Sequence, residues 1–295
     1  MVSLCINDTG DFRSAEEMAS CLKRVGFDGV FLVWDTAENT YAAAKAVEKA
    51  GLFMPSLHAP FVTMATIWQK DNPDGDETIR VLKQNIDCCV DFDTPILVCH
   101  AFIGFADHTP TEIGLSRLEG LMDYALKKNI TVAFENTEGE EYLDAIMQRF
   151  ADCGALGFCW DTGHELCYNR GKDMTAKYGD KLVSTHLNDN FGVTGTDITW
   201  LDDSHVLPFD GIADWNGIAD RLNKIGFSSP LTFELTRQNK PERHTHDRYG
   251  ALSVEEFFEK AHERAVRFAD LMRERNLMRE RNLMRERNLM RERKK

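Results

Sequence analysis

The sequence predicts an α/β fold of the (β/α)8 TIM barrel type, and two observations carry that prediction. Short apolar segments rich in Val, Ile, Leu and Phe alternate eight times with segments of helical periodicity. The apolar segments are nearly continuous, as expected for parallel strands that are buried on both faces. Eight such strand–helix units fit a closed barrel of about 250 residues. An open doubly wound sheet is the alternative, but no GxGxxG motif follows any predicted strand.

The eight predicted strands are, in chain order, Val2–Ile6, Gly29–Trp34, Met54–Ala59, Pro95–Ala101, Thr131–Asn136, Leu156–Thr162, Leu182–Asn188 and Pro230–Leu235. Helical periodicity is found at Ala15–Val25, Tyr41–Lys49, Glu77–Val90, Gly114–Lys128, Tyr142–Phe150, Trp215–Lys224 and Val254–Met272. The last helix is expected to begin with a capping box, because Ser253 is followed three residues later by Glu256. Repeated strand–helix units imply that the strands run parallel.

The chain ends in a repetitive, basic segment. From Leu271 the hexamer Leu-Met-Arg-Glu-Arg-Asn occurs three times and then once more without its Asn. Each repeat advances by roughly 240° around a helix, so the Leu-Met pairs form no lasting seam for a coiled coil. We therefore predict one barrel domain, residues 1–270, followed by a charged, solvated helical extension, residues 271–295. A helix that binds a partner is the alternative for this extension.

The charge of the chain bears on its partners and compartment. The net charge is −13, but residues 271–295 carry +6, which leaves −19 on residues 1–270. Such an acidic body repels polyphosphates, which disfavours nucleic acid and anionic membranes as partners. No apolar run approaches the ~20 residues needed to cross a bilayer, and no signal peptide precedes the first strand. The eight cysteines include no CxxC motif, so we expect reduced thiols in a cytoplasmic protein.

Six consecutive predicted strands end in residues that can carry chemistry. In a barrel of this type, reactive side chains lie at the carboxyl ends of the strands. The third to eighth strands, with the segments directly after them, place the following residues at that rim: His58, His100, Glu135, Asp161, His164, His186, Asp203, His205 and Glu234.

Converging carboxylates need a positive charge between them. Buried carboxylates repel one another and are costly to ionise unless a cation neutralises them. A single His or Glu at a strand end is often structural, but this joint pattern is hard to explain without a metal. Donors for one mixed oxygen and nitrogen site, suited to Mn²⁺, Mg²⁺, Co²⁺ or Zn²⁺, are available from Glu135, Asp161, His186 and Glu234.

The order of these motifs resembles a known superfamily over roughly residues 1–265. The segments that carry the resemblance are Ser56–Pro60, Phe158–His164, Thr185–Asp189 and Asp203–Pro208. They are similar to the xylose-isomerase-like barrels, also called sugar phosphate isomerases/epimerases, which include the AP endonucleases of the endonuclease IV type. The resemblance implies that the metal site shared by the epimerases is formed here by Glu135, Asp161, His186 and Glu234.

The same resemblance implies between one and three divalent metals. Endonuclease IV enzymes hold three zinc ions with nine side chains, and each has a counterpart here. His58, His100 and Glu135 resemble the ligands of the first zinc site. The ligands of the second site resemble Glu135, Asp161, His186 and Glu234, so Glu135 would bridge the two sites. The third resembles His164 with Asp203 and His205. In the epimerases, by contrast, one metal suffices and the residue matching His164 contacts substrate.

Three activities follow from these residues. In the first, an isomerase or epimerase acts on a small ketose or sugar phosphate, and Glu135 and Glu234 transfer a proton at the carbon beside the carbonyl. In the second, a zinc cluster hydrolyses a phosphodiester, as in AP endonucleases. The acidic body weighs against this second activity, because DNA enzymes need a basic strip along the phosphates. The third is another metal-dependent lyase or hydrolase, since the fold does not determine the reaction.

Several residues near the strand ends are candidates for binding the substrate. Aromatic side chains at Trp34 and Phe61 could form a sugar pocket, as could Trp68 and Phe102. Polar contacts are expected from His164, Asn188 and Arg237, and Arg237 with Lys240 and Arg243 could bind one phosphate group. The sequence identifies neither the sugar nor the metal, and a homo-oligomer is compatible with it.

Overall fold

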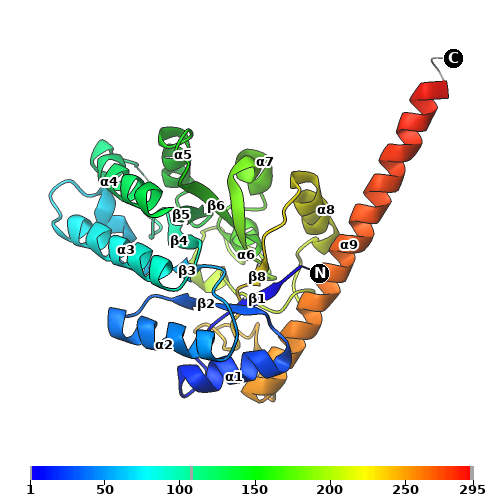
Figure 1. The fold of residues 1–295 in the computed structure, drawn as a ribbon, viewed down its shortest axis with the longest axis horizontal. Coiled ribbons are helices and arrows are strands. Elements are labelled where there is room, and N and C mark those ends of the chain that lie inside the picture. The colour runs from blue at the N-terminus through cyan, green and yellow to red at the C-terminus, as the bar shows by residue number, and fades with distance from the viewer. Residues whose placement is uncertain (1, 107–108, 293–295) are drawn as a thin grey trace.

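The computed structural model describes residues 2–106 and 109–292 and confirms the predicted barrel (Figure 1). Its strands are β1 Leu4–Asn7, β2 Gly29–Val33, β3 Leu57–His58, β4 Ile96–His100, β5 Thr131–Glu135, β6 Leu156–Asp161, β7 Leu182–His186 and β8 Leu231–Phe233. They form one sheet of order β7-β6-β5-β4-β3-β2-β1-β8, and every strand pair in it is parallel.

The barrel closes between its two end strands, β7 and β8. A parallel bridge joins Leu187, just after β7, to Phe233 in β8. The Leu187 N–H donates to the Thr232 carbonyl (2.8 Å), and the Glu234 N–H donates to the Leu187 carbonyl (3.3 Å). Closure excludes the open doubly wound sheet and brings the end of β7 beside the end of β8.

Helices surround the strands. They are α1 Ala15–Val25, α2 Ala37–Lys49, α3 Asp74–Asp91, α4 Glu112–Lys128, α5 Glu140–Arg149, α6 Thr162–Cys167, α7 Met174–Tyr178, α8 Trp215–Ile225 and α9 Val254–Glu292. Short 3₁₀ helices occupy η1 Met64–Trp68, η2 Gly179–Lys181, η3 Trp200–Asp202 and η4 Asp247–Tyr249. The helical periodicity did not reveal α6 and α7, which are only five or six residues long.

All eight strands are shorter in the structure than predicted, and the cause can be identified for two of them. The sixth ends at Asp161 rather than Thr162, because the Asp161 carboxylate accepts a bond from the His164 N–H (2.6 Å) and starts α6 there. The third pairs only at Leu57–His58. Pro55 lies in the predicted part and has no N–H to donate to a neighbouring strand.

Other local predictions can be checked directly. The capping box at α9 is confirmed, since the Ser253 N–H donates to Glu256 (2.8 Å) and the Glu256 N–H donates to the Ser253 hydroxyl (3.2 Å). All eight cysteines lie within the described residues and are free thiols, and Cys153 alone among them is not fully buried. Across residues 2–106 and 109–292, no helix is both long enough and apolar enough to pass through a membrane.

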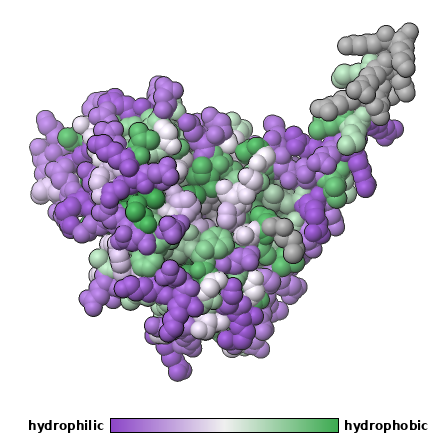
Figure 2. Space-filling model, viewed as in Figure 1, coloured by the Kyte–Doolittle hydropathy of each residue, from purple (hydrophilic) through white to green (hydrophobic). Residues whose placement is uncertain are grey.

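Helix α9 runs without a break from the barrel into the repeat (Figure 1). Leu271 and Met272 still pack against the core, and the Asn223 side chain of α8 donates to the Met272 carbonyl (2.8 Å). Arg275 forms an ion pair with Asp220. Beyond this point exposed apolar and charged residues are interspersed along the projecting helix (Figure 2). The first hexamer therefore packs on α8, and the domain boundary at residue 270 stays a prediction.

These contacts predict where the helix can be shortened. A chain ending at residue 280 keeps the contacts of the first hexamer, so its free energy of unfolding should match that of the full chain within about 0.5 kcal/mol. A chain ending at residue 270 loses the packing of Leu271 and Met272 and should be about 2 kcal/mol less stable. Urea denaturation measures both values, and equal stability of the two shortened chains would contradict the assignment.

Candidate functional site

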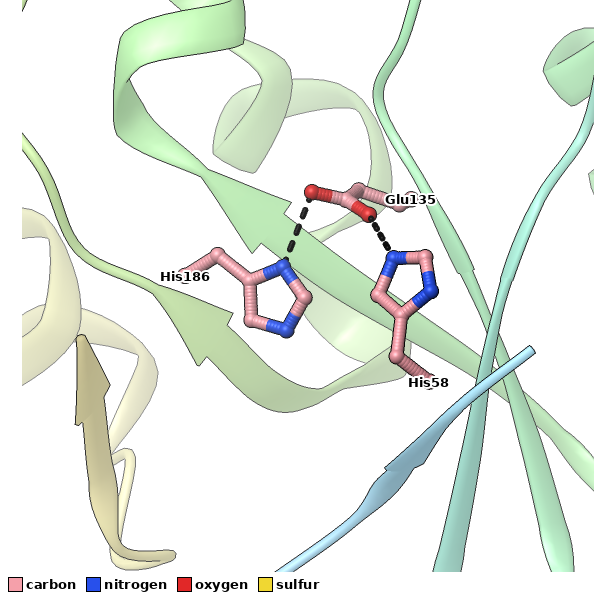
Figure 3. Close-up of side chains that lie close together, drawn as sticks. All are labelled: His58, Glu135 and His186. Atoms are coloured by element: carbon pink, nitrogen blue, oxygen red, sulfur yellow. Dashed lines mark hydrogen bonds and ion pairs between the residues drawn. The ribbon is translucent and has the colours of Figure 1, made fainter. Parts of the chain in front are cut away.

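The centre of the site is the carboxylate of Glu135 at the end of β5, which lies between two imidazoles (Figure 3). Its Oε1 atom is 2.9 Å from His186 Nδ1, and its Oε2 atom is 3.4 Å from His58 Nε2. All three residues are buried. The ring of Phe31 in β2 stacks on His186 with centroids 4.7 Å apart, which fixes the plane of that imidazole.

Three more of the predicted residues join this centre. His100 Nε2 lies 3.5 Å from Glu135 Oε2, and His164 Nδ1 lies 3.3 Å from Glu135 Oε1. Glu234, directly after β8, places its Oε2 atom 3.0 Å from His186 Nδ1. Two carboxylates thus approach the same nitrogen atom of His186.

A second group lies next to the first. His205 Nε2 is 2.7 Å from Asp203 Oδ1 and 3.3 Å from His164 Nε2. The backbone of His205 is left-handed (φ 48°), and its Nδ1–H donates to the Glu234 carbonyl (3.0 Å). His164 connects the two groups, because its other nitrogen faces Glu135.

Asp161 is held in place by residues outside the two groups. Its Oδ1 atom caps α6, and its Oδ2 atom accepts a hydrogen bond from the Asn188 amide (2.9 Å). The Asp161 N–H donates to Asn136, whose own amide donates to the Asp161 carbonyl. Gly163 leaves room for this network, since a Cβ atom there would lie 1.9 Å from Asn188 Oδ1.

The donor atoms fit a divalent cation. The Nδ1–H of His58 donates to the Ala59 carbonyl (2.7 Å), which leaves Nε2 facing Glu135 Oε2 at 3.4 Å as an available metal donor. Buried Glu135 Oε2 and His186 Nε2 have no hydrogen-bond partner. Three sets of donors each lie within 4.8 Å of one another: His58, Glu135 and His186; Asp161, His164 and His205; and Glu135, Asp161, His186 and Glu234.

The surroundings lower the pKa of Glu135 and raise the pKa values of Asp161 and His205. Burial alone would raise the pKa of Glu135, but the charge of His186 and hydrogen bonds from the imidazoles hold that pKa well below its ordinary value. Burial raises the pKa of Asp161 to about 6, against the opposing charges of His164 and His205. Burial would lower the pKa of His205, but Asp203 raises it to about 9. Protons on imidazoles thus balance the carboxylates wherever no metal does.

The family can now be stated. The sequence profile of the xylose isomerase-like TIM barrel family matches residues 19–254. The chain belongs to this family. Among curated proteins, an uncharacterised protein of Sinorhizobium fredii, y4fM, is 26% identical over 220 residues. That match covers 70% of this chain and 63% of y4fM, so the chain spans less than two thirds of the length of this relative.

Solved structures of the same fold are similar over almost the whole chain. L-ribulose 3-epimerase superposes with a TM-score of 0.70 at 16% identity, covering 94% of this chain and 98% of its own. The IolI protein with a bound zinc atom superposes with a TM-score of 0.68 at 19% identity, covering 90% and 97%. At this level of identity the likeness establishes the fold.

A cavity of about 360 Å³ opens onto the family's strand-end rim beside the Glu135 centre. It is lined by eight of the residues named from the sequence: His58, Phe61, His100, His164, Asp203, His205, Glu234 and Lys240. A substrate in this cavity would therefore contact both groups of donors.

The other predicted substrate-binding residues lie elsewhere. Trp34 is buried in the core, and Asn188 is buried with its amide on Asp161. The guanidinium of Arg237 is bonded to Asp11 (3.3 Å) and the Leu252 carbonyl (3.4 Å). The Trp68 indole donates to the Ala101 carbonyl, and Phe102 stacks on Tyr142. In the structure, the aromatic side chains of this set pack within the protein, and the polar side chains bond to other protein groups.

Sequence reasoning missed the aromatic and acidic residues that complete the cavity wall: Phe105, Glu138, Tyr168 and Trp200. Each lies in a loop or a short helix after a strand, several residues beyond the strand end. Their aromatic or acidic character was the available signal, but the position of a loop residue depends on tertiary contacts. Burial raises the pKa of Glu138, whose carboxyl group accepts a hydrogen bond from the Gly104 N–H (2.9 Å).

Gly163 offers a test of the network around Asp161. In Gly163→Ala the new Cβ displaces the Asn188 amide from Asp161, so the free energy of unfolding should fall by about 1–3 kcal/mol. Gly195→Ala is the control, because no atom lies within 4 Å of a Cβ there. Chemical denaturation compares the two variants. Equal stability of both would show that the packing at Gly163 is not restrictive.

Proposed function

We propose that the protein is a divalent-metal-dependent isomerase or epimerase that acts on a small ketose or sugar phosphate. The observation that carries the proposal is the convergence of Glu135, Asp161, His186 and Glu234 within 4.8 Å at one end of the barrel. Three carboxylates and one imidazole form a donor set for Zn²⁺, Mn²⁺, Co²⁺ or Mg²⁺. Two proteins of this fold, an L-ribulose 3-epimerase and the zinc-bound IolI protein, support the same proposal.

The bound metal would polarise a substrate carbonyl and make the neighbouring C–H group more acidic. Glu234 lines the cavity and is the carboxylate positioned to take the proton from that carbon. Burial would raise the pKa of Glu234, but the charge of His186 lowers it to about 2, which keeps the carboxylate ionised at neutral pH. Glu135 is the second carboxylate of the pair. In an isomerisation, Glu234 would pass the proton it has taken to the neighbouring carbon. In an epimerisation, Glu234 would keep that proton, and Glu135 would receive a different proton from the adjacent His164 imidazole (3.3 Å) and deliver it to the opposite face of the carbon.

His164 is placed to act on the substrate oxygens. It lines the cavity between the two groups of donors. Burial disfavours its charged form, but Asp161 and Asp203 hold the pKa of His164 well above its ordinary value. A protonated imidazole in the cavity wall can donate to a developing oxyanion. Phe61 lines the cavity, with its ring stacked on His100 at 4.9 Å between centroids, and offers an aromatic surface to the sugar.

A second candidate is a zinc phosphodiesterase of the AP endonuclease type. It is favoured by His164, Asp203 and His205, which supply the donors for additional zinc ions. The acidity of residues 1–270 weighs against it, since DNA binding needs clustered positive charge. Lys240, a cation of the cavity wall, is paired with Asp203 at 3.1 Å. Another lyase or hydrolase reaction on the same metal is a third candidate.

The proposal predicts tight binding of a divalent metal. Purified protein should hold about one equivalent of metal by elemental analysis, and removal with a chelator should abolish turnover of a ketose substrate. Activity should return on addition of Mn²⁺, Co²⁺ or Zn²⁺. Full activity of the metal-free protein would refute the mechanism. Three zinc ions per chain together with cleavage of an abasic DNA duplex at low salt would instead favour the phosphodiesterase.

The proton-transfer pair gives a separate prediction. Glu135→Gln and Glu234→Gln each remove a carboxylate base while keeping its size, so kcat should fall by roughly 10²–10⁴-fold. Exchange of the substrate hydrogen into D2O, followed by NMR, measures the same step without relying on product detection. Glu77→Gln, an exposed change on α3, is the control and should leave both rates unchanged. Wild-type exchange rates in either site variant would contradict the assignment.

A further inference from the structure

A second cavity lies against the first. It has a volume of about 480 Å³, and both cavities share the side chains of Phe105, Glu138 and Tyr168. The loop after β7 also lines both, with Trp200 at the first and Ile198 at the second. The ring of Tyr168 lies 4.8 Å from that of His164 and 5.9 Å from that of Phe105. The second cavity therefore lies next to the cavity at the Glu135 centre, with Phe105, Glu138 and Tyr168 between the two.

The second cavity combines aromatic surface with side chains that bind hydroxyl groups. Beside the shared residues it is lined by Arg170, Lys172 and Asp197. Arg170 donates to the Thr196 carbonyl (3.1 Å), and Lys172 is paired with Glu140 (2.6 Å). Alternating donors and acceptors next to flat aromatic rings suit the polar edges and apolar faces of a sugar.

The charges in both cavities favour a neutral group over a phosphate. Four carboxyl groups line the second cavity against two cations, Arg170 and Lys172, and Lys172 is paired with Glu140. An anion there would therefore face more negative than positive charge. In the first cavity the ammonium of Lys240 is bonded to Asp203 (3.1 Å) and to the Trp200 carbonyl (2.7 Å). The two arginines predicted to help bind phosphate are bonded elsewhere: Arg237 to Asp11 and Arg243 to Asp202.

We propose that the substrate site extends past Phe105 and Tyr168 into the second cavity, and that the substrate is a keto sugar carrying a neutral second sugar or a similar polar group. This inference rests on the proposed function for the reacting end of the substrate. The keto sugar occupies the cavity at the Glu135 centre, and the attached group occupies the cavity that contains Arg170. The size of the two cavities together exceeds the need of a single small ketose.

The test uses three ketoses that differ at one oxygen. D-Fructose has a free hydroxyl group at C6, D-fructose 6-phosphate carries an anion there, and isomaltulose carries a neutral glucosyl group there. The metal-loaded full chain is incubated with each ketose in D2O, and the rate of hydrogen exchange at C3 gives kcat/KM for that ketose. Calorimetry gives the Kd of each ketose. We expect isomaltulose to exceed the other two at least 10-fold in kcat/KM. Equal or lower values for isomaltulose would overturn the proposal.

Two variants locate the effect in the second cavity. Ile198→Trp fills space there, and Arg170→Asn removes a donor while keeping a residue that tolerates the left-handed backbone (φ 54°) of this position. Each variant should bind isomaltulose at least 5-fold more weakly than the unaltered protein does and should bind fructose with an unchanged Kd. Arg80→Gln, on the exposed face of α3, is the control. Unchanged isomaltulose binding in both cavity variants would overturn the extended site.

The two proposals fail in different ways. If no ketose exchanges its hydrogen but isomaltulose binds and both variants weaken that binding, the proposed reaction is wrong and the extended sugar site stands. If fructose exchanges and isomaltulose has no advantage in exchange or binding, the proposed reaction stands and the extended site is refuted.

Discussion

The buried carboxylate of Glu135 is the group on which the rest of the site depends. Imidazoles from the ends of β3, β4 and β7 and from α6 all approach it within 3.5 Å. Burying an ionised carboxylate costs free energy unless positive charge surrounds it. Each of those segments must therefore place its imidazole at the level of Glu135 along the barrel axis. The parallel register supplies this, because it pairs His100 with Glu135 and Asp161 with His186. Closure of the barrel through Leu187 and Phe233 then adds Glu234 from the last strand.

An outer layer of contacts holds the short helix α6, which carries His164. The Trp160 indole donates to Glu165 (2.9 Å), and Arg221 of α8 both pairs with Glu165 (2.8 Å) and covers the Trp160 ring at 4.3 Å. Trp160 and Glu165 flank the segment that contains Asp161 and His164. The outward side chains of this segment therefore secure its turn against α8, while Asp161 and His164 face the centre of the barrel. A cation–π contact and a buried ion pair serve here to orient neighbouring residues.

The sequence was most informative where position follows from regular structure. Strand ends in a parallel barrel meet at one rim, so the seven donors at or just after strand ends could be predicted together from the alternation of strands and helices. Asp203 and His205 lie in the loop after β7, and their grouping with His164 rested on the resemblance to a known superfamily. The sequence was least informative where side-chain direction decides. Asn188 was expected to contact the substrate, which would require its side chain to face the cavity. Its amide instead donates to Asp161. Phe105 and Tyr168 reach the cavity from irregular segments, whose paths depend on contacts distant in sequence. The short helix α6 escaped prediction because its start is set by one capping carboxylate, not by periodicity.

The two groups of donors differ in how far the chain itself neutralises them. Asp203 has the imidazole of His205 on one oxygen and the ammonium of Lys240 on the other. Asp161 has a backbone N–H on one oxygen and the Asn188 amide on the other. Glu135 and Glu234, by contrast, both approach Nδ1 of His186, and the other groups within 3.5 Å of Glu135 are imidazoles, which neutralise it only while they carry protons. The charge balance at Glu135 and Glu234 therefore depends on imidazole protons, and a cation bound there would take their place. Because Lys240 already acts as a cation at Asp203, the one metal proposed at the Glu135 centre would satisfy the site, and this balance supports the proposed chemistry on a sugar over a three-zinc cluster.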